Sequence, residues 1–217
     1  RTLQGYGLTE TSPVVSIEND FDTRLGSVGK AVNNVEIKIE GKDEKGIGEI
    51  LVKGPNVMLG YYKNDEATKE SLQDGWYHTG DLGYLDLDGF LYITGRKKNV
   101  IVQKNGKNIF PEELEMLINH IPFVKESIVY GRPTWDDDLD ICVKIVYDKD
   151  EIKAVHGYKS EEDILKEMKE YISKINDNMP PYKHIRDVIV TSEELIKTTT
   201  AKVKRHEEIA KILGENK

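Results

Sequence analysis

Cysteine is almost absent from the sequence: Cys142 is the single one, so no disulfide can form within the chain. This absence is typical of proteins from a reducing compartment, and it predicts a cytoplasmic location. Cys142 lies in an apolar segment with no histidine close to it in the sequence. We therefore expect a core side chain there rather than a reactive thiol.

Long apolar runs and a leader pattern are missing as well. No uninterrupted apolar run approaches the roughly 20 residues that a membrane-spanning helix needs. Residues 1–4 do not show the basic and then apolar pattern of a signal peptide, and they lack an initiating Met. We expect a soluble, intracellular chain with no transmembrane segment, taken from a longer protein.

An excess of positive charge is also missing. The 217 residues contain 31 Lys and Arg against 39 Asp and Glu, which gives a formal net charge of −8 at pH 7. This balance argues against a protein that coats nucleic acid or an anionic membrane, and it leaves a local nucleotide site open. The hydrophobic content of 38% is enough for a packed core. The length suits one large domain or two small ones.

The first half of the sequence predicts a β-rich structure. Apolar and polar residues alternate over 35–39, which is typical of a half-buried strand, and 49–53 predicts a second strand after a polar turn. Asp88-Gly89 lies between two apolar segments and is a strong hairpin signal. Residues 13–33 show no clear period and are expected to form a loop.

After Gly95 the pattern changes to mixed helices and strands. A helix is predicted to start at Pro111, because proline and the carboxylates that follow it suit the first helical turn. A longer helix is predicted after Ser160, which with Asp163 has the pattern of a capping box. The other elements expected here are strands at 124–130, 139–147 and 184–190 and a helix at 203–213. The fold class is thus α+β, with a boundary near residues 95–98.

Four segments combine residue types that could bind a nucleotide. They are Gly5-Tyr6-Gly7-Leu8-Thr9-Glu10-Thr11, Tyr77-His78-Thr79-Gly80-Asp81, Gly95-Arg96-Lys97-Lys98 and Lys197-Thr198-Thr199-Thr200-Ala201-Lys202-Val203-Lys204-Arg205. Glycines allow close approach of a ligand, an aromatic ring offers a stacking face, and a carboxylate suits Mg²⁺ beside phosphates. Taken singly, each segment is also compatible with an ordinary feature: a glycine turn, a turn-capping aspartate, a solvated basic surface or a threonine-capped helix start.

Taken together in this order, the segments resemble the adenylate-forming superfamily, which includes acyl-CoA synthetases, firefly luciferase and the adenylation domains of peptide synthetases. Residues 6–10 look like its Tyr-Gly-x-Thr-Glu motif, and residues 77–81 look like its Tyr-x-Thr-Gly-Asp motif. Residues 95–115 are similar to the hinge segment and the helix after it. Residues 197–205 look like the C-terminal Lys-Thr-x-x-Gly-Lys segment. The resemblance covers essentially the whole chain.

The resemblance implies a nucleotide site in the first half. In it, Tyr6 packs on the adenine and Thr9 contacts the α-phosphate. Asp81 takes the ribose hydroxyls with the help of Arg96. Glu10 helps to hold Mg²⁺, as a hard oxygen ligand beside the phosphates.

The resemblance implies three further roles in the second half. Lys98 would be the hinge, Gly106 would lie along the thiol channel, and Lys202 would be the catalytic lysine of adenylation. A fixed cation suits a step in which a carboxylate attacks a phosphate, because two anions are joined. The sequence departs from the family pattern at Ala201, which replaces a glycine and is tolerated unless φ must be positive. Asn105 is an extra residue relative to many members.

The implied domains are 1–95, the C-terminal β-rich part of a large adenylate-binding domain, and 96–217, a small mobile C-terminal domain that carries the lysine. The family's phosphate loop would precede residue 1, so the missing N-terminal part of the same chain is an expected partner. For that reason we expect the 217-residue chain alone to be inactive.

The implied activity is that of an AMP-forming acyl-CoA synthetase, an ATP-dependent acid–thiol ligase. It would use ATP, Mg²⁺ and CoA, and it would convert a carboxylic acid into acyl-AMP and then into acyl-CoA. The pattern around residues 96–115 is closest to fatty acyl-CoA synthetases and favours a fatty acid. One alternative is transfer of the acyl or aminoacyl group to a carrier-protein thiol. An alternative of another class is a non-catalytic scaffold or partner-binding module.

Overall fold

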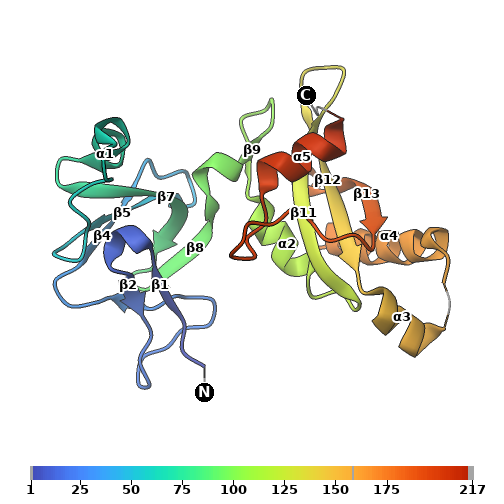
Figure 1. The fold of residues 1–217 in the computed structure, drawn as a ribbon, viewed down its shortest axis with the longest axis horizontal. Coiled ribbons are helices and arrows are strands. Elements are labelled where there is room, and N and C mark those ends of the chain that lie inside the picture. Colours follow the sequence, from blue (N-terminus) through green and yellow to red (C-terminus); the bar gives the residue numbers. More distant parts are fainter. Residues whose placement is uncertain (1, 158, 215–217) are drawn as a thin grey trace. The chain divides into compact units, whose positions relative to one another are not determined.

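The computed structural model describes residues 2–157 and 159–214 (Figure 1). The chain forms two compact units, one up to Asn99 and one from Val100 onward. The sequence predicted a division after residue 95, whereas in the structure residues 96–99 fold with the first unit. Within the described part of the chain, no helix is long and apolar enough to cross a membrane.

The first unit is built mainly of antiparallel strands. Its elements along the chain are β1 (Gly5–Gly7), the 3₁₀ helix η1 (Thr9–Thr11), β2 (Val14–Ile17), β3 (Lys30–Ala31), β4 (Glu36–Glu40), β5 (Gly48–Lys53), α1 (Asp65–Ser71), β6 (Leu72–Gln73), β7 (Trp76–Leu85), β8 (Leu91–Arg96) and the 3₁₀ helix η2 (Lys97–Asn99). One sheet has the order β1-β2-β3. A second has the order β4-β5-β7-β6, and β8 also pairs with β7. The predicted strands and the hairpin at Asp88-Gly89 are present.

Residues 13–33 contain two strands where the sequence predicted a loop. β2 pairs with both β1 and β3, and its Val15 is fully buried. A strand of four residues is too short to show a clear alternation. β1 also replaces the glycine turn that composition favoured for residues 5–11. A Cβ on Gly7 would come within 1.8 Å of the carbonyl oxygen of Pro13, so glycine serves the close approach of two strands.

The second unit combines one three-stranded sheet with helices. Its elements are β9 (Ile101–Val102), β10 (Asn108–Ile109), α2 (Pro111–Ile118), β11 (Val124–Pro133), β12 (Leu139–Tyr147), α3 (Lys149–His156), α4 (Glu161–Asp177), the 3₁₀ helix η3 (Pro181–Lys183), β13 (Ile185–Thr191) and α5 (Arg205–Leu213). The sheet has the order β11-β12-β13, with β12 antiparallel to β11 and parallel to β13. The predicted α+β character of this half is confirmed.

Both faces of the central strand β12 are covered. Ile141, Val143 and Ile145 face a large apolar cluster that includes side chains of α2 and α4. Val146 faces a smaller cluster with side chains of α5, and Lys144 pairs with a residue of that helix. Because successive strand residues point to opposite faces, a strand covered on both sides reads as a nearly continuous apolar run.

The helix starts predicted from the sequence are confirmed. α2 begins at Pro111, and Ser160 caps α4 in a capping box with Asp163. Two short helices were not predicted: α1, capped by the Asn64 side chain, and α3, capped by Asp148. Helices of seven and eight residues have too few turns to establish a period in the sequence.

Candidate functional site

A buried carboxylate in the first unit is held by two side chains from different strands. Asp81 is 5% exposed in β7, and Arg96 lies directly opposite it in the β7–β8 register. Arg96 Nε is 2.6 Å from Asp81 Oδ1, and the Tyr6 hydroxyl donates to Asp81 Oδ2 at 2.6 Å. Three residues that the sequence predicted for nucleotide binding therefore form one cluster.

The Tyr6 hydroxyl is a permanent donor in this cluster. Burial raises the pKa of Tyr6 far above its usual value, and the negative charge of Asp81 raises it further. The phenol therefore stays protonated at neutral pH. The neighbouring backbone is fixed too, because the Thr79 hydroxyl donates to Ile50 O at 2.7 Å and accepts from the Asp81 amide at 3.0 Å. Gly80 between them has φ +71°, which favours glycine.

Thr9 and Glu10 lie on the short helix η1 that follows β1. Thr9 is exposed, and Glu10 is partly buried. Glu10 Oε1 accepts from the Tyr61 hydroxyl at 2.9 Å, and the Glu10 carbonyl accepts from the Met58 amide at 2.8 Å. The sequence motifs do not indicate Tyr61, because it lies 51 residues from its partner.

The residues around Glu10 fit a magnesium ion that is bound mainly through a nucleotide. Within residues 2–157 and 159–214, no group of three or more His, Cys, Asp or Glu side chains could hold a metal by itself. Mg²⁺ usually takes one or two carboxylates and fills its other positions with phosphate oxygens and water. The single, partly buried carboxylate of Glu10 on η1 therefore suits Mg²⁺ that arrives with phosphates.

The predicted hinge residue Lys98 lies on η2, at the end of the first unit. Its side chain is exposed. The preceding Lys97 is anchored, since its Nζ is 2.8 Å from Glu49 Oε2. Val100 begins the second unit one residue after η2, so Lys98 lies next to the point where the chain passes from one unit to the other.

In the second unit, Lys202 lies on a closed hairpin loop. Lys197 and Val203 form an antiparallel bridge. Inside it, the Thr198 amide donates to Lys202 O at 2.8 Å, and Thr198 Oγ1 accepts from the Lys202 amide at 3.2 Å. The Lys202 side chain is exposed, and its ammonium has no hydrogen-bond or ion-pair partner among the described residues. The backbone is thus fixed while the cation is available to an incoming anion.

Ala201 has φ +60°, in the left-handed region that favours glycine. Alanine at this position was expected to be tolerated unless φ must be positive, and φ is positive here. Alanine is therefore strained at position 201, and this strained residue lies directly before Lys202 in the hairpin. Gly106 also has a positive φ, +77°, but glycine adopts this conformation without strain. It lies in a turn where its amide donates to Gln103 O at 2.8 Å.

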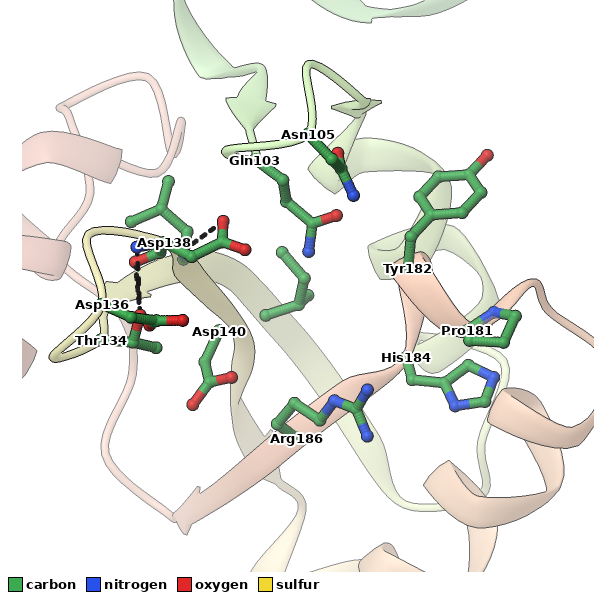
Figure 2. Close-up of a pocket in the computed structure, with 12 residues that line it drawn as sticks. Gln103, Asn105, Thr134, Asp136, Asp138, Asp140, Pro181, Tyr182, His184 and Arg186 are labelled. Atoms are coloured by element: carbon green, nitrogen blue, oxygen red, sulfur yellow. Dashed lines mark hydrogen bonds between the residues drawn. The ribbon is translucent and has the colours of Figure 1, made fainter.

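A polar pocket of about 340 Å³ lies beside the turn that contains Gly106 (Figure 2). Gln103 and Asn105 of this turn line it, and Arg186 lines it from β13. The Gln103 Oε1 atom is buried without a hydrogen-bond partner among the described residues. Asp138 faces the pocket and already accepts from the Lys104 amide at 2.9 Å. The pocket therefore offers both donors and acceptors to a polar ligand, and the sequence motifs did not indicate Arg186.

Comparison with known families identifies the chain. Residues 98–212, more than half of the sequence, match the family of the AMP-binding enzyme C-terminal domain, and residues 1–62 match the AMP-binding enzyme family. The chain belongs to the AMP-binding enzymes. The resemblance inferred from the four segments is therefore confirmed at the level of the superfamily. The roles given to individual residues stay predictions.

Individual relatives of this AMP-binding enzyme include CoA ligases for different acids. The long-chain-fatty-acid–CoA ligase FadD15 of Mycobacterium bovis is 45% identical over 128 residues, which cover 59% of this chain and 20% of that protein. The 2-succinylbenzoate–CoA ligase of Listeria monocytogenes is 34% identical over 212 residues, covering 94% of this chain and 39% of that protein. The chain thus spans about a fifth to two fifths of the length of these relatives.

A solved structure confirms the fold. O-succinylbenzoate coenzyme A synthetase (MenE) from Bacillus subtilis, in complex with ATP and magnesium ion, is 31% identical to this AMP-binding enzyme with a TM-score of 0.78. The match covers 95% of this chain and 41% of that one. The predicted α+β fold class is therefore correct.

Proposed function

We propose that this AMP-binding enzyme is the C-terminal part of an ATP-dependent acid–thiol ligase, which forms an acyl-AMP and then an acyl-CoA. The observation that carries the proposal is the cluster in which Tyr6 and Arg96 hold the buried Asp81. A scaffold has no need of a buried carboxylate held between a phenol and a guanidinium. The relatives support the class of reaction, and their greater length supports a longer parent protein.

In the proposed nucleotide site, Asp81 accepts hydrogen bonds from the paired ribose hydroxyls. Arg96 can serve the same ligand, because its side chain is 46% exposed while its Nε holds Asp81. Tyr6 offers the adenine a ring face, and Thr9 offers the α-phosphate a hydroxyl. Glu10 would hold Mg²⁺, which when bound offsets the charge of the phosphates. ATP and magnesium are also bound by the MenE structure.

The proposed first step is attack of a carboxylate oxygen of the acid on the α-phosphorus of ATP. The new O–P bond forms as the bond to the leaving pyrophosphate breaks, and negative charge accumulates around the phosphorus. Lys202 would place its free ammonium beside this charge, and one such fixed group is worth about 3–4 kcal/mol of barrier. In the second step the CoA sulfur attacks the acyl carbon: a C–S bond forms, the thiol proton is released to water, and the C–O bond to the phosphate breaks as AMP leaves. We propose that Lys98 is the hinge between the two steps and that Gly106 lies along the thiol path.

We propose a fatty acid as the substrate, supported by the resemblance around residues 96–115 and by the FadD15 relative. The second candidate is an aromatic acid, because the succinylbenzoate ligase matches nearly the whole chain. A panel of fatty and aryl acids in a pyrophosphate-exchange assay distinguishes them. The single buried cysteine supports a cytoplasmic location for the ligase.

Two alternatives make different predictions for this chain. A ligase that loads a carrier protein would prefer a phosphopantetheinyl carrier to CoA when both thiols are offered side by side. A non-catalytic module would bind no nucleotide. The CoA ligase is favoured because the FadD15 and succinylbenzoate relatives are both CoA ligases.

Mutation of Lys202 in the complete ligase tests the proposal. We expect Lys202→Ala to lower the rate of acyl-AMP formation by about 100-fold or more, because a donor to the developing charge is lost. Thiolysis of supplied acyl-AMP should change far less, since that step does not build charge on phosphorus. Lys159→Ala, which removes a lysine paired with Glu167 on α4, is the control. Equal loss of both partial reactions in Lys202→Ala would contradict the role.

A further inference from the structure

The hairpin that carries Lys202 is closed at its base by one residue of α5. The Ile196 amide donates to Glu208 Oε2 at 2.9 Å, and the Ile196 carbonyl accepts from the Lys204 amide at 2.7 Å. The Lys204 carbonyl in turn accepts from the Glu208 amide at 3.0 Å. Glu208 therefore holds both arms of the hairpin: its side chain binds the Ile196 amide in one arm, and its backbone amide binds the Lys204 carbonyl in the other.

Glu208 is a fully buried carboxylate with a dedicated counter-ion. Its side chain is 0% exposed, and Lys144 Nζ of β12 lies 2.6 Å from Glu208 Oε1. Burial opposes ionisation of Glu208, but the hydrogen bonds from Lys144 and the Ile196 amide outweigh it and lower the pKa of this carboxyl. The carboxylate thus stays charged, with each oxygen occupied by one donor.

A buried pair of this kind is poor evidence for stability. Removing two charges from water costs about as much as their attraction returns, so apolar side chains would serve the fold equally well. The second donor to Glu208 is a backbone amide of the hairpin, which an apolar side chain could not hold. The charge on Glu208 is therefore better explained by its hydrogen bond to the hairpin backbone than by the packing of α5.

Two further carboxylates, Glu126 of the sheet and Glu115 of α2, support the same segment. Glu126 of β11 accepts from the Leu195 amide at 3.1 Å, and Lys197 Nζ lies 3.1 Å from its Oε2. Arg205, at the start of α5, donates to Glu115 Oε1 at 2.6 Å. The chain is thus anchored before, at and after the base of the hairpin, and only the tip with Lys202 is left exposed.

We propose that Glu208 is a positioning residue for Lys202, an inference that rests on the proposed function. Glu208 does not touch the reacting groups. It fixes the base of the hairpin against the sheet, so that the Lys202 ammonium reaches the α-phosphate from a constant direction. A misplacement of about 1 Å in a charged group of this kind can cost up to about 100-fold in rate. The effect is confined to the step that uses Lys202.

Glu208→Gln is the main test, because the amide has nearly the shape of the carboxylate. A glutamine side chain offers one acceptor oxygen, so either Lys144 or the Ile196 amide loses its partner. We expect the rate of acyl-AMP formation by the complete ligase to fall about tenfold or more, while thiolysis of supplied acyl-AMP stays within about twofold. In the 217-residue chain, hydrogen exchange at the Ile196 and Lys202 amides should become faster.

A second variant and a matched control make the test decisive. Glu208→Asp keeps the charge near Lys144 but is too short to reach the Ile196 amide as well, so it should show the same split between the two steps. Glu167→Gln on α4 breaks the ion pair with Lys159, which precedes that helix, and it should change neither step. Neither residue of this control pair contacts the hairpin in the described part of the chain.

The outcomes separate this inference from the proposed function. If Lys202→Ala impairs adenylation and the Glu208 variants do not, the positioning role is wrong and the function stands. If Lys202→Ala itself leaves adenylation unchanged, the proposed function is wrong. Proportional loss of both steps in the Glu208 variants, or loss of folding in both of them, would show a general structural role and overturn the inference.

Discussion

The Tyr6 hydroxyl lies 2.6 Å from Asp81 Oδ2, although the two residues are 75 positions apart in the sequence. The contact joins the strand β1 of one sheet to β7 of the other. Arg96 occupies the second oxygen of Asp81. A ribose that binds Asp81 therefore meets a carboxylate that is already oriented, and it competes with donors that are already in place.

Replacement of Asp81 by asparagine should weaken nucleotide binding by the chain. Asp81→Asn puts an amide NH₂ against the Tyr6 hydroxyl or the Arg96 guanidinium, so one donor is left without an acceptor. Hydrogen bonds to a charged group are worth about 1.5–3 kcal/mol, which predicts at least about a tenfold weaker affinity for AMP. Isothermal titration of AMP into the 217-residue chain measures this change.

Asp88→Asn provides the matched control for that titration. Asp88 is an exposed carboxylate in the β7–β8 turn that pairs with Arg24, so its loss should leave AMP binding unchanged. Equal affinity in the two variants would contradict the ribose role of Asp81. A flat trace for the unaltered chain at millimolar AMP would favour the scaffold alternative for this chain.

The sequence predicted the local elements better than the contacts between them. The turn at Asp88-Gly89 and the cap at Ser160 are set by neighbouring residues, so both can be predicted from a short window. The strand at Val14–Ile17 depends on pairing with two other strands, and its own residues show no period. Local signals are therefore enough for turns and caps but not for short strands held by their partners.

The same distinction holds for the candidate site. Asp81 and Lys202 were predicted because each lies in a motif whose members are adjacent in the sequence. Glu208 was missed because its partners, Lys144 and the Ile196 amide, are 64 and 12 positions away. In the sequence it is one more acidic residue of a charged helix. A buried positioning residue of this kind is defined by what packs on it, which only the fold shows.

Glycine should fit better than alanine at position 201. A Cβ in the left-handed region costs about 1–2 kcal/mol, and the greater freedom of glycine in the unfolded chain returns about 0.4–1 kcal/mol of this. Ala201→Gly is therefore expected to raise the free energy of unfolding by about 0.5–1 kcal/mol. Urea unfolding of the 217-residue chain, compared by its midpoint and slope, measures the difference.

Ala154→Gly is the opposite control for this prediction. Ala154 lies inside the helix α3, where glycine is expected to cost about 1 kcal/mol relative to alanine. The two substitutions make the same chemical change and should shift stability in opposite directions. Destabilisation by both would show that Ala201 is not under backbone strain.

Cys142 should react slowly in the native chain and quickly after unfolding. Its side chain is fully buried in β12, and burial raises the pKa of the thiol to about 11. Burial disfavours the charged thiolate, so below this pH the native thiol is mainly neutral, whereas an unfolded thiol ionises near pH 8.5. At pH 8 the thiolate fraction is thus about 200-fold lower in the native chain, before any effect of access. Because the sequence has one cysteine, the absorbance released by an aromatic disulfide reagent reports on this thiol alone.

We expect the reaction rate of the native thiol to keep rising with pH beyond 9, and the reaction rate in urea to level off there. Equal rates in buffer and in urea at pH 8 would mean that the sheet does not protect this strand.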